Sequence, residues 1–536
     1  MTEARRKDFN LKGKPDDNRE RFILSSGGIA LFSVLTALSG LLIDILLASD
    51  FGLSGYTDAF YAAYTVPFFI ATMAFSLAYS ALVPIFSRHT EEKAGAEASA
   101  FLSTYLNIAA LAGIALATTG VLMGRGIAGL VAPGMSAETA ELTGRLAELL
   151  SGLVLFSLMA EVLRAFLYAK GAFIYAASSN MMRNVVVVAS LLIFSKRDGI
   201  MSAAYGYTAG YAVQFLALAG WVFLKGGVRY RPVIDRGVYG LRESLKIGVY
   251  QGTGFGILQC VTLAERIIGS YLPAGSITAL SYASRIVFMA VETLSGSIAT
   301  ATLPALSRAV GDMDYKRVQD VMGRSFRFSL LLFLPLTALL IALRGPIITV
   351  LYQRGAFTPE AVAVMSWVLM LYSLSFVFQG YNRLIHNFLF ASLNPKGTLK
   401  LFTVLAAVTI LLDLALVRPL GISAMPLGYL AGSGVAFFIG RRLFVQEFQV
   451  VSGGNYTSFL VRTALLSLLF GGCCYIIFLS FKGVAGADSR MGLLLALFVS
   501  IVPAMGLSVA FGSILKITEL NALRLYISSR IKGFVG

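Results

Sequence analysis

About fourteen separate stretches of this sequence are apolar over roughly 20 residues or more, a length that lets each cross a bilayer as a helix. They make up most of the 536 residues, of which 57% are apolar and only 13% charged, and the mean hydropathy is +0.77. Soluble domains are far more polar. The pattern predicts an all-α polytopic membrane protein whose spans begin near Phe22, Phe60, Ala98, Leu146, Phe173, Ala203, Ile247, Ile277, Phe328, Ala361, Leu399, Ile422, Ser458 and Met491.

The basic residues indicate how the chain is oriented. The 44 Lys and Arg exceed the 28 Asp and Glu and give a net charge of +16, which in a soluble chain would suggest a nucleic-acid partner. Here most of them lie in alternate loops and in both tails, which is the positive-inside pattern. We expect both termini to be cytoplasmic, no nucleic-acid partner, and contact with membrane lipids at two basic loops: Lys225, Arg229, Arg231, Arg236, Arg242 and Lys246, and Arg308, Lys316, Arg317, Arg324 and Arg327.

Several kinds of chemistry lack the residues they need. The three cysteines, Cys260, Cys473 and Cys474, lie inside apolar spans, so neither a disulfide framework nor a zinc site is expected. His89 and His386 are the only histidines, which excludes a histidine metal cluster. The sequence contains no Walker motif, no nucleophile elbow and no dinucleotide-binding motif. We expect no enzyme, no metal and no cofactor apart from a coupling cation, sodium or proton.

The second six spans repeat the first. Segments that match at an offset of about 220 positions include Thr57–Ala62 with Thr278–Ala283, Leu82–Arg88 with Leu303–Arg308, Gly124–Ile127 with Leu343–Ile347, Ser136–Glu138 with Thr358–Glu360, and Phe166–Ala169 with Phe388–Ala391. Six is an even number, so both units enter the membrane in the same direction. This predicts two parallel six-helix repeats with a substrate site between them, lined by spans one, two, seven and eight, plus two extra C-terminal helices.

The repeat divides the chain into six parts. We expect a basic cytoplasmic tail (1–21), an N-lobe of six spans (22–224), a cytoplasmic inter-lobe linker (225–246), a C-lobe of six spans (247–445), an appendage of two spans (457–516) and a cytoplasmic C-terminal tail (517–536).

Ionisable residues within the spans are the candidate functional groups, because each costs several kcal/mol in lipid unless it faces a wet cavity or a partner. They are Asp44, Asp58, Glu161, Arg164, Arg183, Glu265, Arg266, Arg285, Glu292, Arg383, His386 and Asp413. Arg285 has no acid three or four residues away, which favours a cavity-facing group that binds an anion. Asp413 is the sole acid of its span and suits either a cation-coupling site or a hydrogen bond between helices.

The remaining charges have structural interpretations of comparable weight. The pairs Glu161 with Arg164 and Glu265 with Arg266 suit structural ion pairs as well as a substrate site. Arg183 lies close enough to a span end for its side chain to reach the interface. His386 is more typical of an interior histidine.

Local motifs carry a resemblance to a known family. They are Gly52 with Thr57-Asp58-Ala59-Phe60 and Pro67, Ser270-x-Leu272 through Gly275-Ser276 to Tyr282-Ala283-x-Arg285, Leu303-Pro304 with Ser307-Arg308, and Arg354-Gly355-Ala356-Phe357-Thr358. With these motifs and the repeat, the chain resembles the lipid II flippases (the MurJ or MviN family) of the multidrug/oligosaccharidyl-lipid/polysaccharide exporter superfamily over roughly residues 22–516.

The resemblance implies an activity and a site. Family members move an undecaprenyl-pyrophosphate-linked peptidoglycan precursor to the outer leaflet of the bacterial inner membrane by alternating access, through a cationic cavity. Asp44, Asp58 and Arg285 match charged family positions, whereas Ile43, Ala71, Thr72 and Ser284 replace charged ones. Fewer arginines mean fewer donors for a pyrophosphate. Arg164, Arg266 and Arg383, with Glu265 beside Arg266, complete the expected substrate-binding set, and Asp413 is the expected ion-coupling residue.

Other functions are compatible with the sequence. The alternatives are a flippase for another polyprenyl-linked oligosaccharide, such as an O-antigen or exopolysaccharide unit, a drug/cation antiporter, and a membrane scaffold without transport activity. The resemblance implies that spans thirteen and fourteen hold the lipid tail of the substrate, although a packing role fits nearly as well. The expected partner is a polyprenyl-linked glycolipid, and a monomer is expected.

Overall fold

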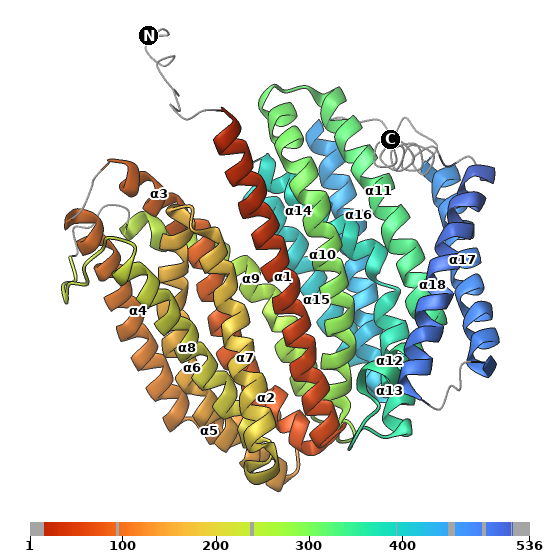
Figure 1. The fold of residues 1–536 in the computed structure, drawn as a ribbon, viewed down its shortest axis with the longest axis horizontal. Coiled ribbons are helices and arrows are strands. Elements are labelled where there is room, and N and C mark those ends of the chain that lie inside the picture. The colour runs from red at the N-terminus through yellow and green to blue at the C-terminus, as the bar shows by residue number, and fades with distance from the viewer. Residues whose placement is uncertain are drawn as a thin grey trace.

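The computed structural model describes residues 15–92, 96–235, 241–392, 394–448, 456–484, 489–515 and 517, and these residues form helices and loops without strands. Figure 1 shows the arrangement. The helices are α1 (Pro15–Phe51), α2 (Gly55–Leu77), the π-helix η1 (Ala78–Leu82), α3 (Val83–Glu92), α4 (Ala96–Leu122), α5 (Gly124–Val131), α6 (Ala137–Ala169), α7 (Phe173–Asp198), α8 (Met201–Leu224), α9 (Leu241–Gly269), α10 (Ser276–Gly311), α11 (Tyr315–Ala342), α12 (Arg344–Tyr352), α13 (Pro359–Ser373), α14 (Phe376–Ala391), α15 (Pro395–Leu420), the 3-10 turn η2 (Gly421–Ser423), α16 (Ala424–Phe448), α17 (Tyr456–Val484) and α18 (Arg490–Ile514).

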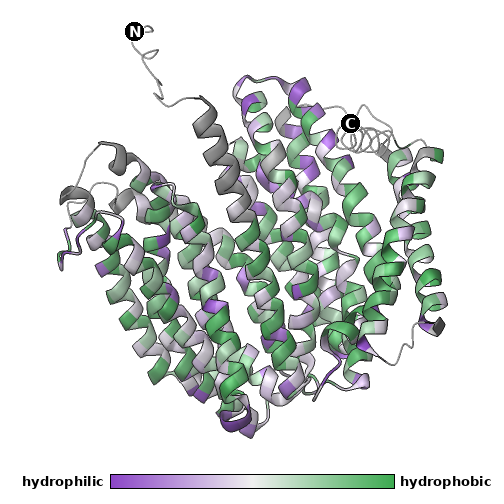
Figure 2. Cartoon of the chain, viewed as in Figure 1, coloured by the Kyte–Doolittle hydropathy of each residue, from purple (hydrophilic) through white to green (hydrophobic). Residues whose placement is uncertain are grey.

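The prediction of an all-α polytopic membrane fold is confirmed. Every predicted span begins inside one of these helices. Among the described residues, 11 segments are long and apolar enough to cross a membrane, or 12 if the pair α13 and α14, bent by 45° at its break, counts as one. The number is below the predicted one partly because a single segment, Lys396–Gln446, covers both α15 and α16. Figure 2 shows apolar residues covering the helices between their two ends.

Two bundles lie side by side (Figure 1). Helices α2–α8 form the first bundle and α10–α16 the second, with α17 and α18 along its outer edge. Helix α1 packs along α7, and α9 packs along both α15 and α2. The bundles are close where α2 and α10 begin, the closed end of the molecule, and they diverge toward the end where α1 begins, the open end.

The repeat produces matching helix starts. Ser136 precedes α6, and its Oγ accepts a hydrogen bond from the backbone N–H of Thr139 at 3.3 Å. Thr358 precedes α13, and its Oγ1 accepts one from Ala361 N–H, also at 3.3 Å. A hydroxyl at this position satisfies one of the N–H groups that a helix start leaves without a partner. The two halves of the chain therefore begin corresponding helices in the same way.

The segment after α8 is fastened to the first bundle. The backbone N–H of Arg229 donates to Ser99 Oγ on α4 at 3.1 Å, and that of Arg231 to Ser103 Oγ at 2.9 Å. At the start of α9, the hydroxyls of Ser244 and Tyr105 lie 3.1 Å apart. The described part of the predicted linker therefore follows α4 instead of spanning freely between the bundles.

Three glycines mark where α9 passes between the bundles. A Cβ at Gly252 would lie 3.2 Å from the side chain of Met73 on α2, and one at Gly254 would lie 3.4 Å from Phe402 on α15. Gly256 faces α2 again, 3.9 Å from Phe69. Without side chains at these positions, α9 contacts both bundles closely.

Candidate functional site

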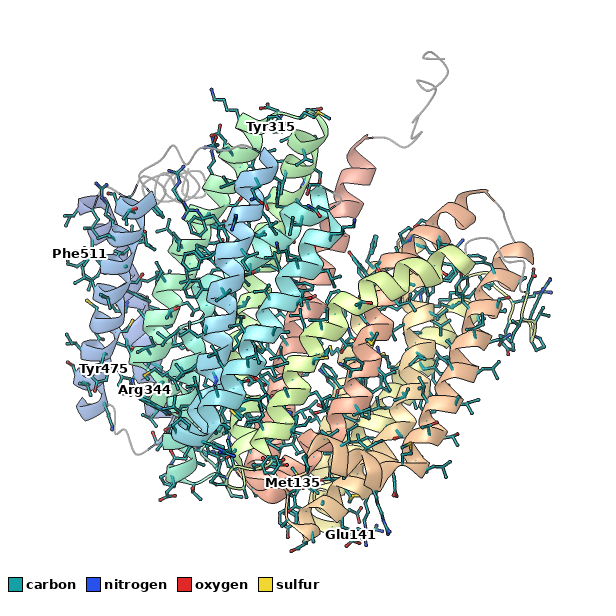
Figure 3. All side chains as sticks on the ribbon, turned by 180° about the vertical axis from the view of Figure 1, so that it is seen from behind. Met135, Glu141, Tyr315, Arg344, Tyr475 and Phe511 are labelled. Carbon is teal, nitrogen blue, oxygen red and sulfur yellow. The ribbon has the colours of Figure 1, made fainter. Side chains whose placement is uncertain are left out.

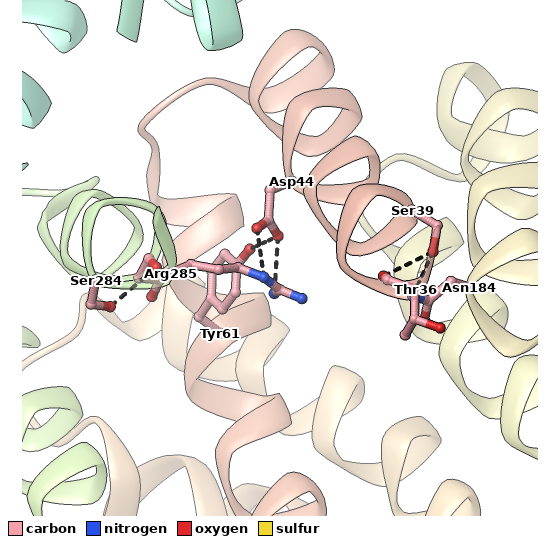
Figure 4. A network of polar contacts seen from close by, with 8 residues as sticks. Thr36, Ser39, Asp44, Tyr61, Asn184, Ser284 and Arg285 are labelled. Carbon is pink, nitrogen blue, oxygen red and sulfur yellow. Dashed lines mark hydrogen bonds and ion pairs between the residues drawn. The ribbon is translucent and has the colours of Figure 1, made fainter. Parts of the chain in front are cut away.

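Three helices bring a polar cluster together between the bundles. Arg285 of α10 forms an ion pair with Asp44 of α1, with Nε 3.1 Å from Oδ2, and its Nη1 donates to Oδ1 at 3.3 Å. The hydroxyl of Tyr61 on α2 donates to the same Oδ1 at 3.0 Å (Figure 4). Asp44 is 0% exposed, whereas 43% of the Arg285 side chain is exposed. The guanidinium is thus held on one side by a buried carboxylate and remains accessible on the other.

The backbone of α1 is shaped to receive this arginine. A Cβ at Gly40 would lie 3.0 Å from Nη2 of Arg285, so a larger residue would crowd the guanidinium. Close to the same glycine, Asn184 of α7 donates from Nδ2 to the carbonyl of Thr36 at 3.1 Å and to Ser39 Oγ at 2.9 Å (Figure 4). These bonds hold α1 against the first bundle while its aspartate contacts the second.

Asp58 of α2 binds the start of α10 at the closed end. Its Oδ2 accepts a hydrogen bond from Gly275 N–H at 2.6 Å, and its Oδ1 accepts from the N–H and hydroxyl of Thr278 at 2.8 and 2.6 Å. The first N–H groups of a helix lack partners and form its positive end, which stabilises a carboxylate. Gly275 has φ 90°, and a Cβ there would overlap Leu53. Asp58 therefore caps α10 from the opposite bundle.

Two further contacts join the bundles at the closed end, and they are related by the repeat. The N–H of Ala356, after α12, donates to the carbonyl of Ser49 in α1 at 2.7 Å. The N–H of Gly134, after α5, donates to Ser270 Oγ, just past the end of α9, at 2.9 Å. Each half of the chain thus places the end of its first span against the loop after the short helix of the other half.

Glu265 and Arg266 are adjacent on α9 but have different partners. The hydroxyl of Tyr372 donates to Glu265 Oε1 at 3.1 Å. Nη1 of Arg266 donates to the carbonyl of Ile277 at 3.1 Å, and its guanidinium lies over the ring of Tyr61, 5.9 Å from the centroid. Both side chains are buried, so Arg266 lies next to the polar cluster without being exposed like Arg285.

The other predicted arginines lie elsewhere. Arg164 is buried inside the first bundle, 3.0 Å from Glu161 Oε1 and with Nη2 donating to Asn180 at 2.8 Å. Arg383 of α14 pairs with Glu292 of α10 at 2.8 Å, and both side chains are substantially exposed. Among the predicted set, Arg285 and Arg383 are therefore the arginines with accessible charge.

Asp413 of α15 is buried in the second bundle, and its carboxylate faces Gly428 of α16. It is 0% exposed, and neither of its carboxylate oxygens has a hydrogen-bond partner within the described ranges. The same holds for Thr409 Oγ1, one turn earlier, and for Ser433 Oγ on α16. A Cβ at Gly428 would overlap the Asp413 carboxylate, and Glu265 is close enough to interact with Asp413 electrostatically. Such oxygens without nitrogen or sulfur ligands suit a hard cation.

In the part of the chain that the structure describes, no three His, Cys, Asp or Glu side chains come together as a metal site. At the four positions where family charges are replaced, Ile43 and Ala71 are buried, Thr72 donates to the carbonyl of Phe68, and Ser284 donates to that of Ser281. Near α1 and α2, Arg285 is therefore the exposed cation, beside the buried Arg266 over Tyr61 and the half-buried Arg183 of α7, whose Nε donates to Asn184 at 3.3 Å.

Sequence reasoning missed the partners of these charges. Tyr61 and Thr278 were not singled out, although they fall in the matching segments Thr57–Ala62 and Thr278–Ala283. The repeat-related rings of Tyr61 and Tyr282 meet edge to face, with centroids 5.7 Å apart. The repeat was the available signal, since residues that match across a twofold axis meet where the two halves touch.

Solved structures with this fold define its class. An inward-facing multidrug resistance MATE transporter of the MOP superfamily shares it with a TM-score of 0.68 and 15% identity over 79% of this chain and 100% of that one. A structure of lipid II flippase MurJ in an inward closed conformation gives a TM-score of 0.75 and 23% identity over 90% of this chain and 99% of that one. The molecule has the fold of MOP-superfamily transporters.

The sequence comparisons narrow the class to one family. The family model described as lipid II flippase MurJ matches residues 47–495, so the chain belongs to the MurJ lipid II flippase family. A probable lipid II flippase MurJ of Bdellovibrio bacteriovorus is 27% identical over 525 residues, covering 95% of this chain and 97% of the relative. One of Thermotoga maritima is 26% identical over 497 residues, covering 92% and 97%. The family resemblance expected from the motifs is confirmed.

Proposed function

We propose that this chain moves lipid II, an undecaprenyl-pyrophosphate-linked peptidoglycan precursor, from the inner to the outer leaflet of the bacterial cytoplasmic membrane. It acts as a monomer, and a prenyl-linked glycan enters between the bundles from the open end. Membership of the MurJ family and the matching length of its relatives support the substrate class. The observation that carries the transport mechanism is the set of inter-bundle bonds at the closed end, made by Asp58, Ser49 and Ser270.

The orientation follows from the distribution of charge. The segment after α8 and the start of α11 lie at the open end (Figure 1), and they carry Arg229 and Arg231, and Lys316 and Arg317, respectively. Basic loops remain on the cytoplasmic side. We therefore assign the open end, with both termini, to the cytoplasm and the closed end to the outer surface, which makes this an inward-facing state.

Alternating access then requires two rigid units. The N-lobe (22–224) and C-lobe (247–445) of the sequence repeat are the proposed units, with 457–516 as an appendage to the second. Breaking a few hydrogen bonds at the closed end would let the outer ends separate as the cytoplasmic ends approach. Because each bond contributes about 1 kcal/mol net, and bonds to charged groups somewhat more, the closed end can be stable yet reversible.

Arg285 is the proposed contact for the pyrophosphate. It is the exposed arginine of the polar cluster, and a guanidinium can bind phosphate oxygens through two N–H groups. Asp44 fixes its orientation and neutralises its charge until an anion arrives. Arg383, exposed on α14, adds a second cation, whereas Asp58, Arg266, Glu265 and Arg164 support the shape of the site.

A second substrate class is favoured by one observation. Ile43, Ala71, Thr72 and Ser284 leave few cationic side chains near α1 and α2, and Arg285 is partly neutralised by Asp44. A flippase for another polyprenyl-linked oligosaccharide would meet the same hydrophobic requirements. The antiporter and scaffold alternatives gain no such support.

We also assign the buried oxygen atoms around Asp413 to a coupling cation, sodium in the first instance. The unpaired carboxylate and hydroxyls of the second bundle support this assignment. A bound cation would attract the neighbouring Glu265 on α9, and its departure would remove that attraction. Because α9 runs between the bundles, this would link the ion to the movement of the lobes.

Complementation tests the function. The full chain is expressed in a bacterial strain depleted of its own lipid II flippase, and growth and outward exposure of lipid II are measured. Restored growth and exposure are expected. A chain that reaches the membrane, restores neither, and instead restores an O-antigen-flippase mutant would establish the second substrate class.

A further inference from the structure

A groove on the outer edge of the second bundle lies apart from the site between the bundles. It has a volume of about 790 Å³ and is formed by α11, the start of α12, α13 and α17, with no residue of α18 among its lining residues. Its lining includes Arg344, Ser366, Trp367, Gly472 and Tyr475. Figure 3 shows Arg344 and Tyr475 near the closed end. Its volume is within the range of about 300–1,000 Å³ that small-molecule sites occupy.

The groove is apolar except for two polar groups that could receive an anion. Arg344 stands at the break between α11 and α12 and is half-buried. Within the described residues, Nη1 of Arg344 donates a hydrogen bond to the carbonyl of Ile341 at 2.7 Å. Most of the five N–H donors of the guanidinium therefore stay available. Ser366 is only 7% exposed, and its hydroxyl has no partner among the residues that the structure describes. A buried hydroxyl without a partner is costly, and an acceptor bound beside it would remove that cost.

Aromatic residues and glycines define the rest of the groove. Trp367 and Tyr475 are about half exposed, and such amphipathic rings are enriched at the level of lipid headgroups. A Cβ at Gly471 would lie 3.0 Å from Ala338, so this glycine brings α17 close to α11. Gly472, in contrast, faces open space with no atom within 4 Å of a Cβ. The missing side chain therefore leaves room along the groove.

The repeat shows that this site depends on the appendage. Arg125 in Gly124–Ile127 matches Arg344, but Arg125 is exposed, and α6 packs against it at Gly144. The first bundle has no counterpart of α17. Of these two repeat-related arginines, Arg344 therefore lines a groove and Arg125 does not.

We propose that this groove binds one anionic phospholipid of the leaflet at the closed end. Arg344 and Ser366 bind its phosphate, and an acyl chain lies along Gly472 between α11 and α17. A phosphodiester carries one negative charge and matches the single cation of the groove, whereas a pyrophosphate would require more. The bound lipid joins the appendage to the second bundle. This site goes beyond the proposed transport function.

Native mass spectrometry of the purified full-length protein with added phosphatidylglycerol tests the proposal. Gly472→Leu fills the groove, and Arg344→Gln removes the cation. The matched controls are Gly506→Leu on α18, which also faces open space, and Arg125→Gln at the repeat-related position. We expect one phosphatidylglycerol to be retained most tightly by the wild type. Its affinity should be about tenfold lower in Arg344→Gln, since a charge-assisted bond contributes about 1.5–3 kcal/mol, and also lower in Gly472→Leu, where the leucine occupies the path of the acyl chain. The controls should match the wild type.

Competition with two other ligands, inorganic phosphate and undecaprenyl phosphate, shows which molecule the groove binds. Inorganic phosphate should not displace the lipid, because it lacks the acyl chain, and undecaprenyl phosphate should bind equally well to wild type and Gly472→Leu. Equal phosphatidylglycerol retention in all variants would overturn the proposal. So would loss of undecaprenyl phosphate binding in Gly472→Leu, because the groove would then hold the substrate tail. If Gly472→Leu does not fold, the phosphatidylglycerol affinity of Arg344→Gln is compared with that of Arg125→Gln, and equal affinities would overturn the proposal.

Discussion

At the scale of single residues, Arg285 has two roles that can be separated. It contacts a fully buried carboxylate, so removing it leaves Asp44 with the Tyr61 hydroxyl but without a counter-charge, and removing one partner of a buried ion pair costs up to about 3–5 kcal/mol. It also has an exposed side available to an anion. A simple loss of activity in Arg285→Ala would not distinguish folding from substrate binding.

The double variant Asp44→Asn/Arg285→Gln makes the distinction. Because both charges are removed together, we expect membrane levels and thermal stability close to wild type, but complementation should be lost because the pyrophosphate contact is missing. Arg285→Lys should retain partial activity, since an ammonium cannot reproduce two parallel N–H bonds. Growth at wild-type rates by the double variant would remove Arg285 from the substrate site.

If Asp413 binds the coupling cation, its substitution should change the sodium dependence of transport. In Asp413→Asn the carboxylate charge is lost while the shape is kept, so transport should become independent of a sodium gradient and fall to the rate that the wild type shows without sodium. Lipid II exposure in vesicles with and without a sodium gradient is the measurement. Glu141→Gln, an exposed acid on α6 outside the substrate site, serves as control and should keep the sodium dependence. A sodium dependence that survives in Asp413→Asn would make this residue structural.

At the scale of elements, the start of α10 depends on a residue of α2. Asp58→Asn replaces one acceptor oxygen with an amide nitrogen that cannot accept, so the bonds to either Gly275 or Thr278 are lost, and the remaining bonds lose the carboxylate charge. We expect the closed end to open more often, because losing charge-assisted bonds costs about 1.5–3 kcal/mol. Labelling of Ser270→Cys by a membrane-impermeant maleimide should rise by about tenfold or more. Asp50→Asn, an exposed acid at the same end of α1, is the control and should leave labelling unchanged.

Elements were predictable to different degrees. The spans follow from hydropathy because lipid requires about 20 apolar residues per crossing, and each predicted start falls in a helix. The π-helix η1 and the 45° bend between α13 and α14 depend on how neighbouring helices pack, which no local pattern reports. The bonds from Asp58 to α10 and from Arg285 to Asp44 join residues more than 200 positions apart. The sequence identifies these charged residues as candidate functional groups, but it does not predict which residues they contact.

At the scale of the whole molecule, alternating access predicts that joining the lobes stops transport. The 2.7 Å bond between Ala356 N–H and the Ser49 carbonyl limits their Cα separation to about 6.5 Å, within disulfide range. Oxidised Ser49→Cys/Ala356→Cys should therefore lose lipid II exposure and regain it on reduction. The control pair Ser190→Cys/Ser202→Cys joins α7 and α8 within the first bundle, and its oxidation should leave transport intact. Full cross-linking of the first pair without loss of transport would contradict rocking lobes.

The attachment of residues 229–231 to α4 determines where the molecule can bend. This segment and Ser244, at the start of α9, are bonded to the first bundle, so the described parts of the connection between the lobes are held there. The pivot must lie farther along, where Gly252, Gly254 and Gly256 alternate between α2 and α15. The glycine stretch would then be the hinge of α9. The rotation that closes the cytoplasmic side would be transmitted between the lobes through this single helix.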